Sequence, residues 1–379
     1  MRGFRVVVCP DSFKGSLTAK EASAAIAAGV RLAVPDAEVI ERPMADGGEG
    51  TMAVLAAAWG VEPVMVDAVD ATGRPCQAAY ALSPDAVAIV ELASASGLPA
   101  VSDEPLRPLD ADTSGTGEVL AAALRAGARE VLLGVGGSAS TDGGSGILRA
   151  LGVRLLDASG REVPRGGRGL ADVTSIDTTD LLPQARDARW RIAVDVTNPL
   201  VGPHGAAMVY GPQKGATHAD LALLDAALTT WARVLGIDPA TPGFGAAGGV
   251  PAGLAAVLGA TLEPGATLVA KAIGLPAAIA GADLVITGEG RFDSQSLAGK
   301  VVAGVVAAAA NVPVIVLAGE VALEFGAYRS SGVTGALSIT PGPASLDDLV
   351  RNTAAHLTEA AAATAALAHA AGWAPETPH

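Results

Sequence analysis

The two ends of the chain alternate between short β-branched runs and alanine-rich segments. Residues 5–10 form an apolar run that is typical of a strand covered on both faces. A polar turn follows, and Thr18 and Glu21 have the spacing of a capping box before a helix that extends to about residue 32. A strand over residues 38–43, cap spacing at residues 46–49 and a helix to about residue 59 complete a second βα unit. Repeated units of this kind predict a parallel, doubly wound sheet.

The alternation resumes near residue 283, after a middle segment with a different pattern. There the sequence predicts strands over residues 283–287, 312–317 and 335–339, a helix over 300–310, and a long capped helix over 345–371. In the middle segment, residues 61–92 indicate short strands separated by turns at 71–75 and 83–85. We therefore expect one α/β domain built from both termini (1–66 and 282–379), with an inserted mixed α/β domain (67–281).

Composition narrows the classes of function. The chain has 379 residues, 50% hydrophobic but only 3% aromatic, and its formal net charge is −14. Such an acidic chain is a poor candidate for binding nucleic acid or an anionic membrane. The two cysteines, Cys9 and Cys76, exclude a disulfide framework. An uncharged run over 301–319 contains Asn311 and Pro313, which favours a buried helix and strand over a membrane span. We expect a cytoplasmic protein that binds neither nucleic acid nor membrane.

Polar residues follow the predicted strands at the places where those strands end. Asp11 and Lys14 come after the first strand and Asp46 after the second. Glu289, Arg291 and Asp293 follow the strand that is predicted to end at residue 287. Parallel strands present their carboxyl ends at one edge of a sheet, and ligands bind there. Each residue alone would suit an ordinary turn or helix cap, but together they predict a site.

Lysine is rare in this chain, and its positions are informative. Only five lysines occur, and three of them stand beside glycine: Lys14, Lys214 and Lys300. An ammonium next to flexible backbone is suited to meeting a phosphate group. Chance placement among so few residues is the alternative interpretation.

Residues 134–146 (GVGGSASTDGGSG) form the densest glycine-rich segment. It follows a predicted strand and precedes a short helix, so its backbone N–H groups could bind phosphates. Gly134, Gly136 and Ala139 also pass a loose test for a dinucleotide-binding loop. No Walker A motif occurs, since Gly299-Lys300 lacks the upstream glycine and is followed by Val301.

Acidic residues on separate loops are candidates for holding Mg²⁺ or for accepting a proton. Asp142 lies in the glycine-rich segment and Asp195 ends a predicted strand over 191–196. Glu289 and Asp293 flank Arg291. Mg²⁺ prefers one or two carboxylates together with phosphate oxygens, which isolated acids can provide.

Six segments, in order along the chain, resemble the bacterial glycerate kinases of the two-domain type. They are residues 10–16 (PDSFKGS), 45–50 (ADGGEG), 134–146, 195–200 (DVTNPL), 211–216 (GPQKGA) and 287–293 (TGEGRFD). The resemblance implies a flavodoxin-like domain joined to a second α/β domain. It also implies ATP-dependent phosphorylation of D-glycerate, with 2-phosphoglycerate as the usual product.

A mechanistic hypothesis follows from this resemblance, with the active site in the cleft between the two domains. Lys14 and Arg291 hold the substrate carboxylate or the transferring group. ATP binds to Gly136, Gly137, Ser138, Gly143 and Gly144, together with Lys214 and Lys300. The ligands expected for Mg²⁺ are Asp195, Asp293 and Glu289. Asp46 or Asp142 accepts the hydroxyl proton.

Several alternatives stay open from the sequence. The product could be 3-phosphoglycerate, since the sequence does not determine which hydroxyl reacts. A dinucleotide-dependent hydroxy-acid oxidoreductase is favoured only by the glycine-rich segment. A non-catalytic sensor of sugar acids or nucleotides would use the same cleft, but no basic helix-turn-helix accompanies it. The alanine-rich final helix would suit either a core or the interface of a homodimer.

Overall fold

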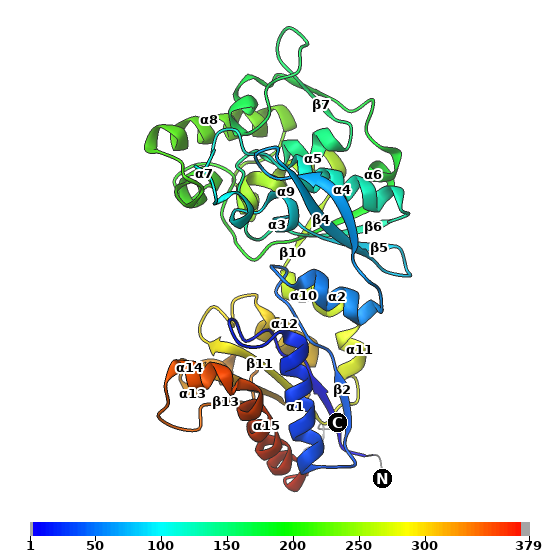
Figure 1. Cartoon of the computed structure of the whole chain (residues 1–379), viewed down its shortest axis with the longest axis vertical. Helices are drawn as coiled ribbons and strands as arrows, with labels where there is room; N and C mark the ends of the chain where they lie inside the picture. The colour runs from blue at the N-terminus through cyan, green and yellow to red at the C-terminus, as the bar shows by residue number, and fades with distance from the viewer. Residues whose placement is uncertain (1–2, 373–379) are drawn as a thin grey trace. The chain divides into compact units, whose positions relative to one another are not determined.

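The computed structural model describes residues 3–372 and divides them into two compact units (Figure 1). Unit 1 comprises residues 3–46 and 264–372, and unit 2 comprises Gly47–Glu263. The discontinuous organisation expected from the sequence is present, but the expected boundaries at 66–67 and 281–282 lie further along the chain. The helix α2 (Thr51–Trp59) packs on the strands of unit 2, and α10 (Gly265–Ala272) packs on a helix of unit 1. Neither association is visible in local sequence.

Unit 1 contains a five-stranded, wholly parallel sheet with the order β13-β12-β11-β1-β2. Counted along the chain within this unit, the order is 2-1-3-4-5, which is the flavodoxin-like arrangement. The α/β class and the doubly wound sheet predicted for both termini are therefore confirmed. The strands are β1 (Arg5–Val8), β2 (Glu38–Glu41), β11 (Leu284–Phe292), β12 (Val314–Val321) and β13 (Gly335–Ser338).

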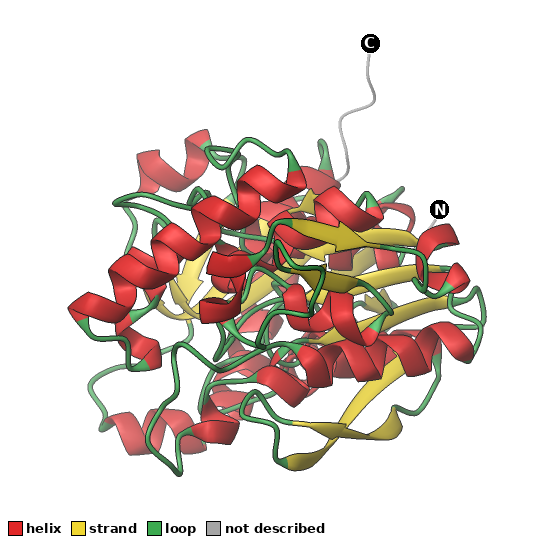
Figure 2. Cartoon of the chain, turned by 90° about the horizontal axis from the view of Figure 1, so that it is seen from above, coloured by secondary structure: helices red, strands yellow, loops and turns green. Residues whose placement is uncertain are grey.

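Helices pack along the strands, as Figure 2 shows by colour. In unit 1, α1 (Ala19–Ala33) and α15 (Thr353–Ala370) lie side by side, and Gly29 allows their close approach. A Cβ at Gly29 would lie 2.2 Å from the Thr358 carbonyl oxygen. The predicted capping box of Thr18 and Glu21 is present. The remaining helices of this unit are α10, α11 (Leu275–Ile279), α12 (Val301–Ala309), α13 (Phe325–Ser330) and α14 (Leu346–Arg351).

The C-terminal helix differs from its prediction. The sequence predicts one helix over 345–371, but the structure has α14 and α15 with a break at Asn352. Ser345 does cap the first of them, since its side chain accepts from the Asp348 amide. The break lets α14 contribute to the surface while α15 contributes Leu357 and other buried residues to the core. The alanine-rich helix is thus core on one face, and the homodimer stays a prediction.

Unit 2 contains a six-stranded mixed sheet with the order β10-β9-β6-β5-β4-β3. The strands β3, β4 and β5 pair antiparallel, whereas β5, β6, β9 and β10 pair parallel. Their bounds are β3 (Val64–Val69), β4 (Pro75–Leu82), β5 (Val87–Glu91), β6 (Glu130–Gly134), β9 (Arg189–Ala193) and β10 (Thr261–Glu263). A separate antiparallel pair consists of β7 (Arg154–Leu156) and β8 (Ser175–Asp177). The inserted mixed α/β domain predicted from the sequence is confirmed.

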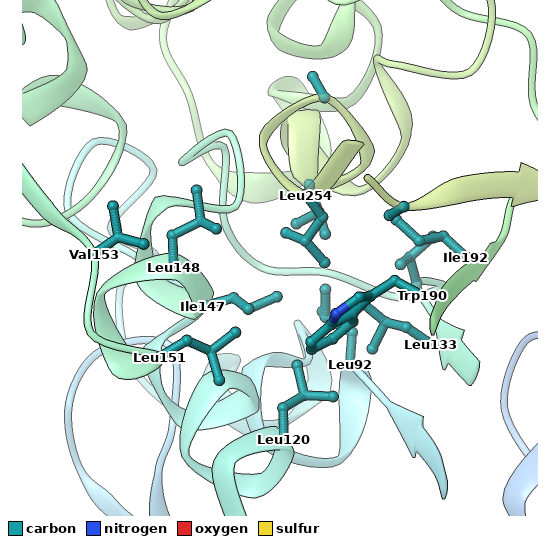
Figure 3. Packing of buried hydrophobic residues seen from close by; sticks show 14 of the residues in the cluster. Leu92, Leu120, Leu133, Ile147, Leu148, Leu151, Val153, Trp190, Ile192 and Leu254 are labelled. Carbon is teal, nitrogen blue, oxygen red and sulfur yellow. The ribbon is translucent and has the colours of Figure 1, made fainter. Parts of the chain in front are cut away.

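The core of unit 2 lies between this sheet and its helices (Figure 3). Trp190, fully buried, packs there and donates its indole N–H to the Ala185 carbonyl at 2.8 Å. Arg191 on the same strand pairs with Glu130 and Glu263 on the two neighbouring strands. The helices are α3 (Ala93–Ser96), α4 (Ser114–Arg125), α5 (Ser145–Ala150), α6 (Pro183–Asp187), α7 (Ala206–Tyr210), α8 (His218–Leu235) and α9 (Val250–Leu258), with short 3₁₀ turns at Pro99–Val101, Gly167–Asp172, Pro212–Lys214 and Ala246–Gly249.

The apolar run over 301–319 forms the buried helix α12 and the buried strand β12, as predicted. Within residues 3–372 we find no helix with both the length and the apolar character needed to span a membrane.

Candidate active site

The topological switch point of unit 1 lies between β1 and β11, where the strand order reverses. The chain leaving β1 stays attached to β11, since the Asp11 amide donates to the Gly288 carbonyl at 2.8 Å. The buried Thr287 hydroxyl donates to the Cys9 carbonyl at 2.9 Å. A Cβ on Gly288 would lie 2.3 Å from the Leu317 carbonyl oxygen, so only glycine fits there. Ligands of doubly wound sheets bind at this kind of edge.

The strand at this edge is longer than predicted. The sequence placed Glu289 and Arg291 in a loop after residue 287, but β11 continues to Phe292. The extension pairs with β12, where Arg291 lies opposite Glu320. Because side chains alternate along a strand, Glu289 and Arg291 lie on one face and Gly290 on the other. Tertiary pairing with β12 thus decides the direction of both candidate side chains.

Glu289 is the most perturbed acid at this edge. Burial raises its pKa to about 7, and the negative charges of Asp11 and Asp293 add to the shift, against Ser296 and Lys300. Its Oε1 atom is buried and has no hydrogen-bond partner. A buried oxygen without a donor is unfavourable, and such atoms call for an explanation such as a bound ion.

Asp11 stands beside Glu289 and is also perturbed. Burial raises the pKa of Asp11 to about 6, and the charge of Asp46 contributes further. The Ser12 amide donates to the Asp11 Oδ1 atom at 2.6 Å, which opposes the shift. Sequence reasoning noted Asp11 among the polar residues after the first strand but gave it no role. Its position directly after the strand was the available signal.

The structure brings the other candidates of unit 1 to the same edge. Lys14 is exposed in a tight loop, and its charge acts on Asp11, as does that of the half-buried Asp46. Lys300 takes the N-cap position of α12, and its charge acts on Glu289. Arg291 is exposed and pairs with two acids, at 3.0 Å from Glu320 and 3.5 Å from Asp293. Asp293 also accepts from the Gln295 amide at 2.9 Å in the turn after β11.

The glycine-rich segment of unit 2 has an exposed tip and a buried inner half. Gly136 and Gly137 are exposed directly after β6, and Ser138 is buried beside them. A Cβ on Gly136 or Gly137 would meet nothing closer than 3.4 Å, so space remains at the tip. Backbone N–H groups at such a tip can bind an anion.

The inner half of this segment is closed by packing. A Cβ on Gly143 would lie 2.5 Å from Trp231 of α8, and one on Gly144 would lie 2.9 Å from Leu254 of α9. These two glycines serve helix packing, and they are buried. The next helix, α5, begins only at Ser145, whereas a dinucleotide-binding loop enters its helix at once.

Asp142 is fully buried and saturated with hydrogen bonds. Its Oδ2 atom accepts from the Thr113 amide at 3.0 Å, the Thr113 hydroxyl at 2.8 Å and the Gly146 amide at 3.0 Å. Its Oδ1 atom accepts from the Ser140 hydroxyl at 3.1 Å. These contacts favour a role in organising the loop over a role as the proton acceptor.

Lys214 is also inside the protein, with an exposed fraction of only 2%. Its ammonium donates to the Ser138 hydroxyl at 2.8 Å and to the Ser140 carbonyl. Burial lowers the pKa of Lys214 to about 7, against the opposing effect of Asp142. The sequence predicted a phosphate contact for this residue. The structure shows this amine supporting the glycine-rich segment from within, and its contact with a phosphate stays a prediction.

Asp195 is exposed at the carboxyl end of β9. Because β9 pairs with β6 through Ala193 and Gly134, Asp195 follows its strand at the same edge as the glycine-rich tip. Nearby Asn198 is held in place by the Tyr210 hydroxyl, which donates to it at 2.8 Å. An acid beside an anion-binding tip is a suitable arrangement for a metal-bound phosphate.

Glu91 is a further residue at this edge that sequence reasoning missed. It ends β5, and its Oε1 atom accepts from the Met52 amide at 2.7 Å in the first turn of α2. The sequence predicted that residues 46–49 would cap this helix, but its N-cap is Gly50 without a side-chain bond. Glu91 supplies the carboxylate that takes the place of the cap. Because Glu91 is distant from α2 in the sequence, the spacing of residues near the helix cannot reveal this contact.

The structure offers partial metal sites and no complete one. Among residues 3–372, no group of three or more His, Cys, Asp or Glu side chains is arranged to hold a metal ion. Mg²⁺ often takes only one or two carboxylates and completes its shell with phosphate and water. The unpartnered Glu289 Oε1, with Asp11 beside it, fits such a partial site.

An α/β fold with acids of raised pKa at a flavodoxin-like switch point, and an open glycine tip in a second unit, is typical of enzymes that act on phosphate groups. The sequence profile of the Glycerate kinase family matches residues 6–369. The chain belongs to that family.

Individual relatives agree with this assignment. The chain is 43% identical to a glycerate kinase of Halalkalibacterium halodurans, over 94% of this chain and 96% of that one. It is also 43% identical to the glycerate 2-kinase of Escherichia coli K12, over 92% of this chain and 93% of that one. A crystal structure from Salmonella typhimurium LT2, assigned as a glycerate kinase 2, superposes with a TM-score of 0.88 at 41% identity. It covers 98% of this chain and 100% of that one.

Proposed function

We propose that this protein transfers the γ-phosphoryl group of ATP to D-glycerate and forms 2-phosphoglycerate and ADP. The observation that carries the proposal is the acidic switch point of a glycerate kinase family member. Glu289 keeps a buried carboxylate oxygen without a donor, and Asp11 lies beside it. A carboxylate positioned in this way can accept a hydroxyl proton or hold a cation.

The reaction needs positioning, charge neutralisation and one proton acceptor. The C2 hydroxyl oxygen of glycerate forms a bond to the γ-phosphorus. The bond from that phosphorus to the bridging oxygen breaks, and ADP leaves with the electron pair. The hydroxyl proton passes to a carboxylate. We propose Asp11 or Asp46 for that role, since both lie at the switch point and their charges interact.

The cationic groups neutralise the anions that gather during transfer. Lys14 and Arg291 are exposed at the switch point, where either can bind the glycerate carboxylate or the transferring group. Lys300 stands at the start of α12, where the helix dipole adds to its charge. In unit 2 we propose the tip Gly136–Gly137 and Ser138 as an anion cradle supported by Lys214.

We also propose that the phosphoryl transfer uses Mg²⁺. The carboxylates that would hold it in unit 1 are Glu289 and Asp293, and Asp195 is a separate candidate within unit 2. When bound, the ion would neutralise phosphate charge and orient the oxygens of ATP.

We also propose that the enzyme is cytoplasmic, since Cys9 and Cys76 are both free thiols.

The test is turnover of D-glycerate with Mg-ATP, coupled to enolase in the absence of phosphoglycerate mutase. Enolase uses only the 2-phosphate, so a signal reports both kinase activity and attack by the C2 hydroxyl. ADP formation that depends on glycerate, but without an enolase signal, would move the product to 3-phosphoglycerate. Absence of both signals would refute the proposed function.

A further inference from the structure

Unit 1 contains a cavity of about 410 Å³. It lies at the carboxyl ends of β11, β12 and β13, and the loop after β1 and the helices α14 and α15 complete it. Its size falls in the range of small-molecule sites. Its position is the edge at which doubly wound sheets bind ligands.

One side of the cavity is bare backbone. Gly290 of β11 and Gly319 of β12 line it, and a Cβ on Gly319 would lie 2.6 Å from the Gly290 carbonyl oxygen. The space beside Gly290 is open, since a Cβ there would meet only the Lys14 amide nitrogen, at 3.8 Å. Glycines in strand interiors often mark a close approach of backbone to a ligand. A surface without side chains suits a flat ring.

The opposite side is apolar and exposed. Leu346 and Val350 line the cavity with exposed fractions of 75% and 36%, together with Leu349. The short helix α14 has no buried residue at all, so its leucines face solvent or the cavity and not the core. Phe13 and Ile339 complete this apolar lining. Clustered exposed apolar side chains mark ligand grooves.

Most of the polar groups around the cavity are already engaged. The Ser16 hydroxyl donates to the Val350 carbonyl at 2.9 Å, and the Thr340 hydroxyl donates to the Gly319 carbonyl at 2.9 Å. Glu320 pairs with Arg291. Lys14 is the exposed cation in the lining. The cavity therefore combines a flat backbone side, an apolar side and one cationic group.

We propose that this cavity binds the base and ribose of an adenine nucleotide, with the phosphates directed toward Lys14. The inference rests on the proposed ATP-dependent function and locates the nucleoside part of ATP within unit 1. Glycerate has an oxygen on every carbon, so it has no apolar face to match Leu346 and Leu349. A planar heteroaromatic ring has such faces, and His356 and Thr340 provide polar atoms for its edge.

The test uses two cavity variants with matched controls, all in the full-length enzyme. Leu346→Glu places a charge in the apolar side, and Leu367→Glu is its control, because Leu367 on α15 is 71% exposed and outside the cavity lining. Gly290→Val fills the backbone side, and Gly326→Val on α13 is its control, where a Cβ meets nothing within 4 Å. The probe is ADP, measured by isothermal titration, together with steady-state kinetics and melting temperatures.

We expect both cavity variants to weaken ADP binding by about tenfold or more, while both controls bind as the wild type does. If KM for ATP rises in parallel and KM for glycerate does not, the bound nucleotide is the phosphoryl donor. If ADP binding falls but KM for ATP is unchanged, the same chemistry serves a separate regulatory nucleotide. If neither variant changes ADP binding while both remain folded, the proposal is overturned. If the wild type does not phosphorylate glycerate but the cavity variants still lose ADP binding, the proposed function is refuted and the proposed nucleotide site is not.

Discussion

The buried acids at the switch point of unit 1 and in the glycine-rich segment of unit 2 differ in how far their oxygens are hydrogen-bonded. Glu289 keeps a buried oxygen without a donor, whereas both oxygens of Asp142 accept hydrogen bonds, from Thr113 and from their own loop. An unsatisfied buried acid is unfavourable until a ligand arrives, but a saturated one stabilises the fold. The contrast separates an acid that is available to bind a ligand or proton, Glu289, from an acid that stabilises the loop around it, Asp142.

The largest expected effect tests the first half of this comparison. Glu289→Gln keeps the shape of the side chain but removes its charge, so we expect kcat to fall by about 10²- to 10⁴-fold. Stability should be equal or higher, because burial disfavours the charged carboxylate that is removed. Steady-state kinetics with ATP and glycerate and a thermal melt measure the two effects. Full activity in this variant would remove Glu289 from the site.

The second prediction tests the structural role of Asp142. Asp142→Asn places an amide NH₂ against donors such as the Thr113 amide, so we expect a loss of about 2–4 kcal/mol in the free energy of unfolding. Urea unfolding of the wild type and the variant measures this loss. The remaining folded protein should keep most of its kcat. A stable but inactive Asp142→Asn enzyme would contradict the structural role and restore Asp142 as a proton acceptor.

The third prediction concerns pH. Burial lowers the pKa of Lys214 to about 7, so above that pH the folded protein has lost a proton that the unfolded chain keeps until about pH 10. The unfolded state then binds more protons, and the contribution of Lys214 to stability rises with pH from about 7 to 10. Below pH 7 both states are protonated and this contribution is flat.

Urea unfolding at several pH values, for the wild type and Lys214→Met, isolates this effect. The difference in unfolding free energy between them should increase with pH in favour of the wild type. Lys271→Met is the control, because Lys271 is exposed on α10, and it should show no such trend. Parallel pH profiles for the wild type and Lys214→Met would show that the ammonium is not desolvated.

The smallest expected effect concerns the distant cap of α2. Glu91→Ala leaves the Met52 amide without its side-chain acceptor. Because burial raises the pKa of Glu91, losing its charge offsets part of this effect, and we expect a net loss of about 1 kcal/mol in unfolding free energy. Chemical unfolding at neutral pH measures it. Glu49→Ala, in the preceding loop and exposed, is the comparison and should change stability by less. A larger loss in Glu49→Ala would instead support the local cap that the sequence predicted.

Much of the fold was predictable because it rests on local patterns. The βα alternation, the capping box at Thr18, and the division of residues 301–319 into a helix and a strand all appear as expected. The candidate residues of unit 1 also gather at one edge, since parallel strands bring their carboxyl ends together. The end of β11 was not predictable, because its last residues are strand only through pairing with β12.

The dipeptides Lys14-Gly15 and Lys214-Gly215 mark the limit of sequence reasoning. They look alike in sequence, and both glycines have positive φ, at 77° and 85°. Lys14 is exposed at the switch point, but Lys214 is 2% exposed beneath a loop some 75 residues earlier in the chain, as its bond to Ser138 shows. The sequence by itself determined the βα units, the helix caps and the turns, because these depend on residues that are close together in the chain. Only the tertiary structure decided which charged groups are buried, because burial and pKa depend on residues that the fold brings from far away.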